Sequence, residues 1–186
     1  MTKSVYITDT GNNRIIERSV PGLDYIAKLT SITTDFPTLQ TLILEAPCIA
    51  ANSTDLFVYD QNLGLAMKTS LSNVGVSGTS NTPPFDNSYG VWADNTHVYL
   101  FNSSTNSVDV YYASTMAFKS SIASYTVDSV PYTFTDVISG CSDGTNLYIC
   151  DDGTLIKFSI SPIVAVPVGI RGAGYIYAEG ICTDGT

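Results

Sequence analysis

Acidic and amide side chains recur at matching places along this chain, and they are the residues best suited to chemistry. Asp94, Asp143 and Asp184 each stand two residues before a threonine, and Asn52 holds the same place in another copy. Carboxylate, amide and backbone oxygens are the ligands of calcium, which takes about six to eight of them. One interpretation is therefore a calcium site. We favour a structural interpretation, because Asp and Asn at such positions accept hydrogen bonds from the following backbone and form turns.

Patterns for other catalytic chemistry do not occur in the sequence. His97 is the one histidine, and several would be needed to hold a zinc ion through histidines. No serine lies in a Gly-x-Ser-x-Gly elbow, and no glycine-rich loop is followed by the lysine of a phosphate-binding loop. We interpret His97 as a solvated turn residue, because Asp55 and Asn146 hold the same place in other copies. The glycine-rich stretch 169–174 is interpreted as a flexible connection.

Trp92 and Tyr89 are the aromatic binding candidates. Their rings combine an apolar face with a polar group, and with nearby asparagine side chains they could hold a sugar. Trp92 also has a structural interpretation, because Ala50, Cys141 and Cys182 occupy its place in the other copies. A large ring among small residues is expected to fill space between neighbouring repeats.

These candidates belong to a phrase that the chain repeats. It reads NSTDLFVYD at 52–60, DNTHVYLFN at 94–102 and DGTNLYICD at 143–151, and its opening returns as DGT at 184–186. Each polar turn precedes an uninterrupted apolar run, which is typical of a strand covered on both faces. Another such strand at 5–9 lacks its turn, and the turn at 184–186 lacks its strand. The two ends of the chain would therefore complete one repeat.

These strands end at Asp9, Asp60, Asn102 and Asp151. Asp and Asn end strands by bonding to their own backbone, and we expect this of these residues. The same residues set the period. They lie 51, 42 and 49 residues apart, near the period of about 40–50 residues of a four-stranded propeller blade. We therefore predict an all-β fold, a β-propeller of four-stranded antiparallel blades, with four blades in this chain and closure by the two termini. The expected repeats of this single domain, 1–186, are 1–45, 46–88, 89–136 and 137–178, with 179–186 completing the first blade. The outermost strands are expected at 25–29, 69–72, 117–122 and 163–168.

The first repeat resembles a known family. Its segment VYITDTGNNRIIERS, 5–19, is similar to the NHL repeat, and residues 9–15 match that family's Asp-Thr-Gly-Asn-Asn-Arg phrase and the strand that follows. Thr8 stands where the family usually has Ala, and the other repeats lack the Arg of the turn. The turn is also explained by its chemistry, since Gly11 and the two asparagines tolerate positive φ and Asp9 can accept backbone donors. The resemblance implies a propeller and names no ligand.

The amino-acid composition excludes some classes of binding partner. The chain has 17 acidic and 8 basic residues and a formal charge of −9, which argues against nucleic acid and anionic membranes as partners. No apolar stretch approaches the about 18 residues of a membrane span. The 4 cysteines lack the spacing of a zinc site or a disulfide scaffold and are interpreted as small buried hydrophobes. Few charges and many Ser, Thr, Asn and Tyr slightly favour an extracellular or virion surface.

Two classes of function remain. The first is a non-enzymatic scaffold for protein binding or self-association, as a secreted, appendage or virion surface component; its 12 tyrosines supply large contacts at small entropic cost. The alternative is a metal-dependent hydrolase or lyase, with calcium as its cofactor, or a carbohydrate-binding lectin. The candidate binding residues are Trp92, Tyr89, Asp94, Asp143 and Asp184. We expect the scaffold, with no catalytic residue, no cofactor and no metal site.

Overall fold

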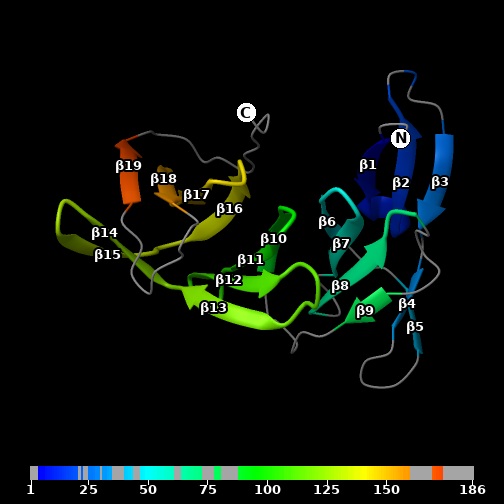
Figure 1. Ribbon diagram of the computed structural model, residues 1–186, viewed down its shortest axis with the longest axis horizontal. Coiled ribbons are helices and arrows are strands. Elements are labelled where there is room, and N and C mark those ends of the chain that lie inside the picture. The colour runs from blue at the N-terminus through cyan, green and yellow to red at the C-terminus, as the bar shows by residue number, and fades with distance from the viewer. Residues whose placement is uncertain are drawn as a thin grey trace. The chain divides into compact units, whose positions relative to one another are not determined.

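The computed structural model describes residues 4–20, 22, 25–29, 31–34, 40–43, 47–60, 64–72, 78–80, 88–159 and 169–173. The chain divides into two compact units, Met1–Pro84 and Phe85–Thr186, each with its own hydrophobic core (Figure 1). The described elements are strands apart from one 3-10 turn, η1 (Thr10–Asn12). Among the described residues, no helix is long and apolar enough to cross a membrane.

The first unit contains two sheets. One has the order β1-β2-β3, and the other has the order β5-β4-β9-β8-β7-β6, in which β6 to β9 form an antiparallel four-stranded blade. The β4–β5 hairpin joins the outer edge of that blade through one parallel bridge, Thr34 to Gly78. The strands are β1 (Ser4–Asp9), β2 (Arg14–Ser19), β3 (Tyr25–Leu29), β4 (Ser31–Thr34), β5 (Gln40–Ile43), β6 (Pro47–Ala51), β7 (Asp55–Asp60), β8 (Leu65–Ser70) and β9 (Gly78–Ser80).

The second unit contains two antiparallel four-stranded sheets, β10-β11-β12-β13 and β16-β17-β18-β19, and a hairpin of β14 and β15. The β14–β15 hairpin (Figure 1) packs on the second of these sheets, since Tyr125 belongs to the core cluster and its ring centre lies 5.6 Å from that of Phe158. Its turn residues Asp128 and Ser129 both have positive φ, as a tight two-residue hairpin requires. The strands are β10 (Ser88–Ala93), β11 (His97–Asn102), β12 (Ser107–Tyr112), β13 (Phe118–Ile122), β14 (Ser124–Val127), β15 (Val130–Thr133), β16 (Val137–Ser142), β17 (Asn146–Asp151), β18 (Thr154–Ser159) and β19 (Gly169–Ala173).

The strand boundaries confirm the repeated phrase. β1 ends at Asp9, β7 at Asp60, β11 at Asn102 and β17 at Asp151, the residues predicted to end them. On β7, β11 and β17 most apolar side chains are buried from both sides, as the uninterrupted runs predict; Leu56, Phe57, Val58 and Tyr59, for example, are all almost inaccessible. On β1 the prediction is wrong for Val5 and Ile7, which are 40% and 44% exposed. β7, β11 and β17 are therefore interior strands of their blades, whereas β1 lies at the edge of the described β1-β2-β3 sheet.

The outermost strands agree less well with the sequence. Those expected at 25–29 and 117–122 are present as β3 and β13. The expectation for 69–72 is wrong, because 69 and 70 belong to β8 and the outer strand is β9. The strand expected at 163–168 lies outside the described residues, and the outer position is taken by β19. The interpretation of 169–174 as a flexible connection is therefore wrong, because 169–173 forms strand β19 and pairs with β18.

Within the second unit the two sheets pack face to face. β10 and β11 lie against β16, and one cluster contains Tyr99 and Phe101 together with Leu147 and Ile149. A side chain on Gly140 would place its Cβ 2.8 Å from two carbons of the Phe101 ring. Only glycine therefore lets the ring approach this closely, as expected where small residues line closely packed strands.

Candidate functional site

The repeated turns are built by one side-chain oxygen each. Asp94 Oδ1 accepts the backbone N–H groups of Thr96 at 2.7 Å and His97 at 2.8 Å. Asp143 Oδ1 accepts those of Thr145 at 2.8 Å and Asn146 at 2.6 Å. Both residues therefore form the turns that the structural interpretation of the sequence predicts.

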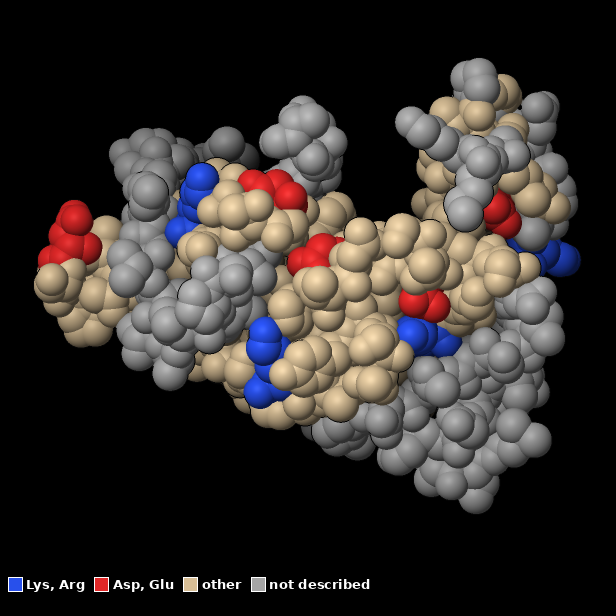
Figure 2. Space-filling view, viewed as in Figure 1, with Lys and Arg blue, Asp and Glu red and all other residues tan. Residues whose placement is uncertain are grey.

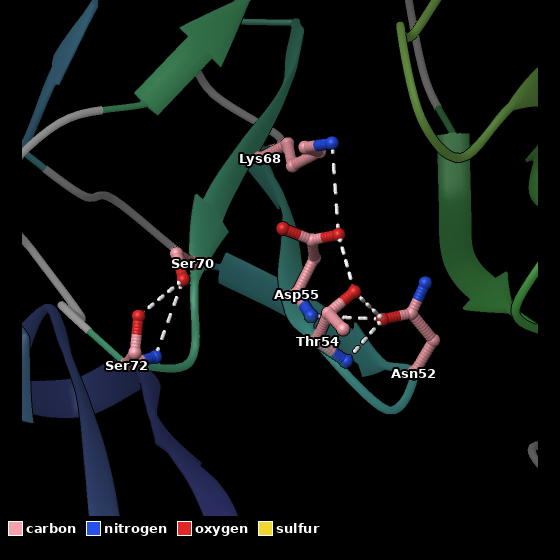
Figure 3. Close-up of polar contacts among 6 residues, drawn as sticks. All are labelled: Asn52, Thr54, Asp55, Lys68, Ser70 and Ser72. Atoms are coloured by element: carbon pink, nitrogen blue, oxygen red, sulfur yellow. Dashed lines mark hydrogen bonds and ion pairs between the residues drawn. The ribbon is translucent and has the colours of Figure 1, made fainter.

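Figure 3 shows the same turn in the first unit. Asn52 Oδ1 accepts the backbone N–H groups of Thr54 at 2.9 Å and Asp55 at 2.8 Å. The Thr54 hydroxyl donates to Asp55 Oδ2 at 2.8 Å, and the Lys68 ammonium lies 3.6 Å from that oxygen. The turn between β6 and β7 is thus joined to β8 by an ion pair.

The second carboxylate oxygen of Asp94, and that of Asp143, accepts a hydrogen bond from a tyrosine hydroxyl. Tyr99 OH donates to Asp94 Oδ2 at 3.1 Å, and Tyr148 OH donates to Asp143 Oδ2 at 2.9 Å. The corresponding residue after Asn52 is Phe57, which has no hydroxyl. Asn52 has an amide nitrogen in place of the second oxygen, so it needs no such donor. The pairing of Asp with Tyr and of Asn with Phe is a sequence signal that the search for catalytic groups missed.

The hydrogen bonds also set the charge of the turn carboxylates. Burial opposes ionisation of Asp94, but the bonds from Thr96, His97 and Tyr99 together hold its pKa below the ordinary value. Bonds from Asn146, followed by that from Thr145, hold the pKa of Asp143 far below its ordinary value, against a smaller effect of desolvation. Both groups are therefore carboxylates at neutral pH whose lone pairs are largely committed to the turn.

A chain of hydrogen bonds crosses the β10–β13 sheet at the same turn. Lys119 Nζ lies 2.7 Å from His97 Nε2, His97 Nδ1 lies 2.9 Å from Thr96 Oγ1, and Thr96 Oγ1 lies 2.7 Å from Asp94 Oδ1. An ammonium can only donate, which assigns the ring proton to Nδ1 and leaves Nε2 as acceptor. Burial, and then Lys119, lowers the pKa of His97. His97 is thus half-buried in strand β11, which corrects its interpretation as a solvated turn residue.

The turns of the two sheets in the second unit are tied together. Ser142 Oγ donates to Asp94 Oδ2 at 3.2 Å, and the same hydroxyl accepts the backbone N–H of Gly144 at 3.0 Å. Trp92 is half-buried and packs against the core cluster that both sheets share. Its indole nitrogen is buried and has no hydrogen-bond partner among the described residues. The ring fills space between repeats, as the structural interpretation of Trp92 predicts.

Two large aromatic side chains are exposed at this end of the β10–β13 sheet. Phe118 is 57% exposed and Tyr112 is 45% exposed. The Lys119 ammonium lies 5.6 Å from the centre of the Tyr112 ring, and Phe118 meets Tyr111 edge-on with ring centres 5.6 Å apart. Register places Phe118 on the face of Tyr111, and Tyr112 with His97 on the opposite face of the same strand ends. We call His97, Tyr112, Phe118 and Lys119, which lie at this end of the sheet, the aromatic rim. The sequence analysis did not single out the last three, because exposure cannot be read from a run of strand residues.

The remaining candidates can be placed only in part. Asp184 lies outside the described residues, as do Cys182 and the segment 179–186 that was expected to complete the first blade. Tyr89 lies in β10, but its side chain is outside the described part of the structure. Among the described residues no three His, Cys, Asp or Glu side chains form a group that could hold a metal ion. The structure therefore joins Asp94 to Ser142 and leaves Asp143 in its own turn.

The strand-ending residues use their side chains differently. Asn102 Oδ1 accepts the backbone N–H groups of Ser104 at 3.1 Å and Thr105 at 3.2 Å, as predicted. Asp151 instead accepts those of residues 135 and 136, each at 2.8 Å. The expectation of a local turn bond is therefore wrong for Asp151, which fixes the approach to β16.

The turn between β1 and β2 also differs from expectation. Asp9 accepts from two side chains, Asn12 Nδ2 at 2.8 Å and Arg14 Nε at 2.6 Å, and not from the backbone donors expected. These bonds, first that of Asn12 and then that of Arg14, lower the pKa of Asp9. Positive φ falls on Asn13 and not on Gly11. Arg14 therefore locks the turn by an ion pair.

Comparison with known proteins identifies the fold. No protein-family model matches the sequence, and no curated protein matches it. Among solved structures, U3-55K is 15% identical over 90% of this chain and 47% of its own, with a TM-score of 0.60. Streptogramin B lyase is 10% identical over 94% of this chain and 52% of its own, with a TM-score of 0.56. A chain of the nidogen/laminin complex is 15% identical over 98% of this chain and 81% of its own, with a TM-score of 0.52.

These structures are β-propellers, so the chain has a β-propeller fold. This confirms the predicted class, all-β with four-stranded antiparallel blades. The chain spans about half the length of U3-55K and of streptogramin B lyase. Identities this low establish the fold and nothing about function. The number of blades and closure by the termini stay predictions.

Proposed function

We propose that this chain is a non-enzymatic β-propeller scaffold that binds protein, either a partner or further copies of itself. The observation that carries the proposal is the aromatic rim, which exposes Phe118 and also Tyr112, whose ring lies beside the Lys119 ammonium. Large exposed apolar side chains gather at sites of protein binding, and Tyr and Phe are enriched at protein interfaces, with Tyr among the residues that contribute most to binding.

Hydrogen bonds within the chain position the aromatic rim. The loop from 113 to 117 is tethered to the repeated turn, since Ala113 N donates to Thr96 O at 2.9 Å. Met116, whose side chain is fully buried, donates its N–H to Tyr112 O at 2.8 Å. A partner that binds here therefore orders few side chains, which lowers the entropic cost of association.

The turn carboxylates support the same assignment. Asp94 and Asp143 each accept bonds on both oxygens from their own blades or from the next one. A role in metal chemistry would require them to give up these bonds. Figure 2 shows that most of the described surface on the side drawn is uncharged, with acidic and basic residues in small separate groups. Such a surface suits protein contacts better than nucleic acid, given the acidic charge of −9.

The finer features of the proposal rest on composition and on the first repeat. We place the first blade with NHL-type repeats, because Asp9, Asn12 and Arg14 of that phrase hold the turn together. We place the protein on a secreted, appendage or virion surface because of its few charged residues, 13% of the chain. The nidogen/laminin structure, with the same fold, is a complex of proteins, which supports protein binding as the use of this surface.

The test is a matched capture experiment. The wild-type chain, the Tyr112→Ser, Phe118→Ser double variant and a Val130→Ser control are immobilised, and extracts and medium of the producing cells are passed over each. Val130 is 49% exposed on the β14–β15 hairpin and is not part of the rim. We expect a protein retained by the wild type and the control and lost from the rim variant. With that protein purified, the rim variant should bind it at least about tenfold more weakly. Equal binding by all three chains would contradict the proposal.

A further inference from the structure

The place of His97 holds a different kind of side chain in each repeated turn. His97 is the first residue of β11, and Asp55 and Asn146 are the first residues of β7 and β17. The three side chains are an imidazole, a carboxylate and an amide. Of these, the imidazole is the one whose charge changes between about pH 5 and 8. His97 therefore makes one repeat sensitive to mild acid at a place where the other two are not.

In the first unit this place holds a lysine by opposite charge. The Lys68 ammonium of β8 lies 3.6 Å from the Asp55 carboxylate (Figure 3). In the β10–β13 sheet a lysine also lies against this place, since Lys119 Nζ of β13 is 2.7 Å from His97 Nε2. A neutral imidazole holds an ammonium as a hydrogen-bond acceptor and not by opposite charge. The contact with Lys119 therefore depends on the protonation state of His97.

Protonation of His97 replaces this acceptor with a like charge. Nε2 is the ring atom that accepts from Lys119, so the added proton binds there and faces the ammonium. Two like charges in contact repel, and more strongly where water is partly excluded. Nδ1 already donates to Thr96 Oγ1 at 2.9 Å, and that hydroxyl donates to Asp94 Oδ1 at 2.7 Å, so the ring stays anchored. The Lys119 side chain is therefore the part that moves.

The groups around His97 leave Lys119 as the cation that opposes its protonation. Burial, and then Lys119, lowers the pKa of His97, against a smaller opposite effect of Asp94. Of the strands packed on β11, β12 contributes Asp109, which register places on the other face, and β10 and β16 contribute no charged side chain. Asp143, which follows β16, is bonded within its own turn. The remaining titratable residues of these strands are of types that stay uncharged in mild acid, and they are Tyr89, Tyr99, Tyr111, Tyr112 and Cys141.

We propose that protonation of His97 in mild acid switches the aromatic rim, releasing Lys119 from His97 and Tyr112 and weakening the binding of the rim to its protein partner. With neutral His97, Lys119 is held at Nε2 and lies 5.6 Å from the centre of the Tyr112 ring. Release removes this arrangement, so that a partner must order both side chains itself. The effect on binding rests on the proposed function, whereas the movement of Lys119 is a property of the chain alone.

The movement is measured by NMR on the chain without a partner. His97 is the sole histidine, so its ring signals are identified by residue type and give its midpoint between about pH 7.5 and about pH 5. We expect the ε-methylene signals of Lys119, which the Tyr112 ring shifts upfield, to move downfield in acid with the same midpoint. Lys157 is the matched control, because it lies 5.6 Å from the centre of the Tyr148 ring in a repeat without the histidine. Its signals should not follow that midpoint.

Two variants test the cause of the movement. His97→Gln has a neutral side chain that does not titrate, so the Lys119 signals should be independent of pH in this range. Lys119→Met removes the neighbouring cation, so the midpoint of His97 should rise. Circular dichroism checks that each chain is folded at each pH, and His97→Asn, which copies the third repeat, replaces His97→Gln if the latter is not. Lys119 signals that do not follow His97, signals that still shift in His97→Gln, or an unchanged midpoint in Lys119→Met would each overturn the proposal.

The effect on binding is measured with the protein that the capture experiment retains. Its apparent dissociation constant should rise by up to about tenfold for each pH unit below the midpoint of His97, and His97→Gln should lose this rise. The same rise in both chains would contradict the switch. If no protein is retained, the proposed function fails, while the NMR titration still decides whether Lys119 moves. The two failures are therefore distinguishable.

Discussion

Gly140 offers the sharpest test of how the blades meet. A Cβ added there would lie 2.6 Å from the carbonyl oxygen of Tyr148 and 2.8 Å from two carbons of the Phe101 ring. Contacts this short force the ring and the strand to move, and overpacking of this kind costs about 1–3 kcal/mol. We therefore expect Gly140→Ala to lower the free energy of unfolding by that amount. The loss is measured by urea denaturation of the wild type and the variant.

Gly90 is the matched control, because it faces the same ring. A Cβ on Gly90 would lie 3.7 Å from Phe101, an ordinary contact, so Gly90→Ala should leave stability unchanged or raise it slightly. Phe101→Leu should relieve part of the cost of Gly140→Ala, which appears as a coupling energy in a double-mutant cycle. Equal effects of the two Gly→Ala changes, or no coupling to Phe101, would refute the packing described between these sheets.

Three further predictions concern the turns and the joint between the sheets. Asn52→Ala and Asp94→Ala should each cost about 0.5–2 kcal/mol, and the double variant should lose the sum, since the residues act in different sheets; a loss far from the sum would contradict independent turns. Burial, and then Lys119, lowers the pKa of His97 on folding, so the unfolded chain takes up its proton first, and stability should fall as pH drops from about 6.5 to about 5; His97→Gln should remove the fall in that interval and leave the fall at lower pH that follows from the lowered pKa values of Asp94 and Asp143, and an unchanged fall above about pH 5 would contradict this role of His97. Trp92→Ala should cost about 3 kcal/mol, the lower end for aromatic truncation because the ring is half-buried, and an unchanged melting curve would show that the ring is not structural.

The central strands could be predicted from the sequence because their signals are local. A turn residue, an apolar run and a terminal Asp or Asn recur in each copy, and the strand ends fall on the predicted residues. The outermost strands could not, because their pairing is decided by the neighbouring strand and not by their own pattern. β19 reads GIRGA, with a composition that disfavours strands. β9 has three residues and no recognisable alternation.

The site was predictable to a similar extent. Asp94 and Asp143 were identified as turn formers from their spacing, and their hydrogen bonds agree. The aromatic rim could not be identified, since Tyr112 is exposed while its neighbour Tyr111 is buried, and a single sequence does not show which blade face meets another blade. Across the repeats Asp occurs together with Tyr, and Asn together with Phe, and this pattern can be read from the sequence. The structure supplies its reason, because each tyrosine hydroxyl donates a hydrogen bond to the second oxygen of the turn carboxylate.

The measurement that tests the central claim most directly is a thermal melt of the purified chain with calcium and with a chelator. If the turn carboxylates serve the fold and the protein acts as a scaffold, the two melting temperatures should be equal. If they hold a cation that a hydrolase, lyase or lectin uses, binding must stabilise the folded state, by about 2.7 kcal/mol when calcium is present at 100 times its dissociation constant. A calcium-dependent rise that the chelator reverses would contradict the scaffold proposal.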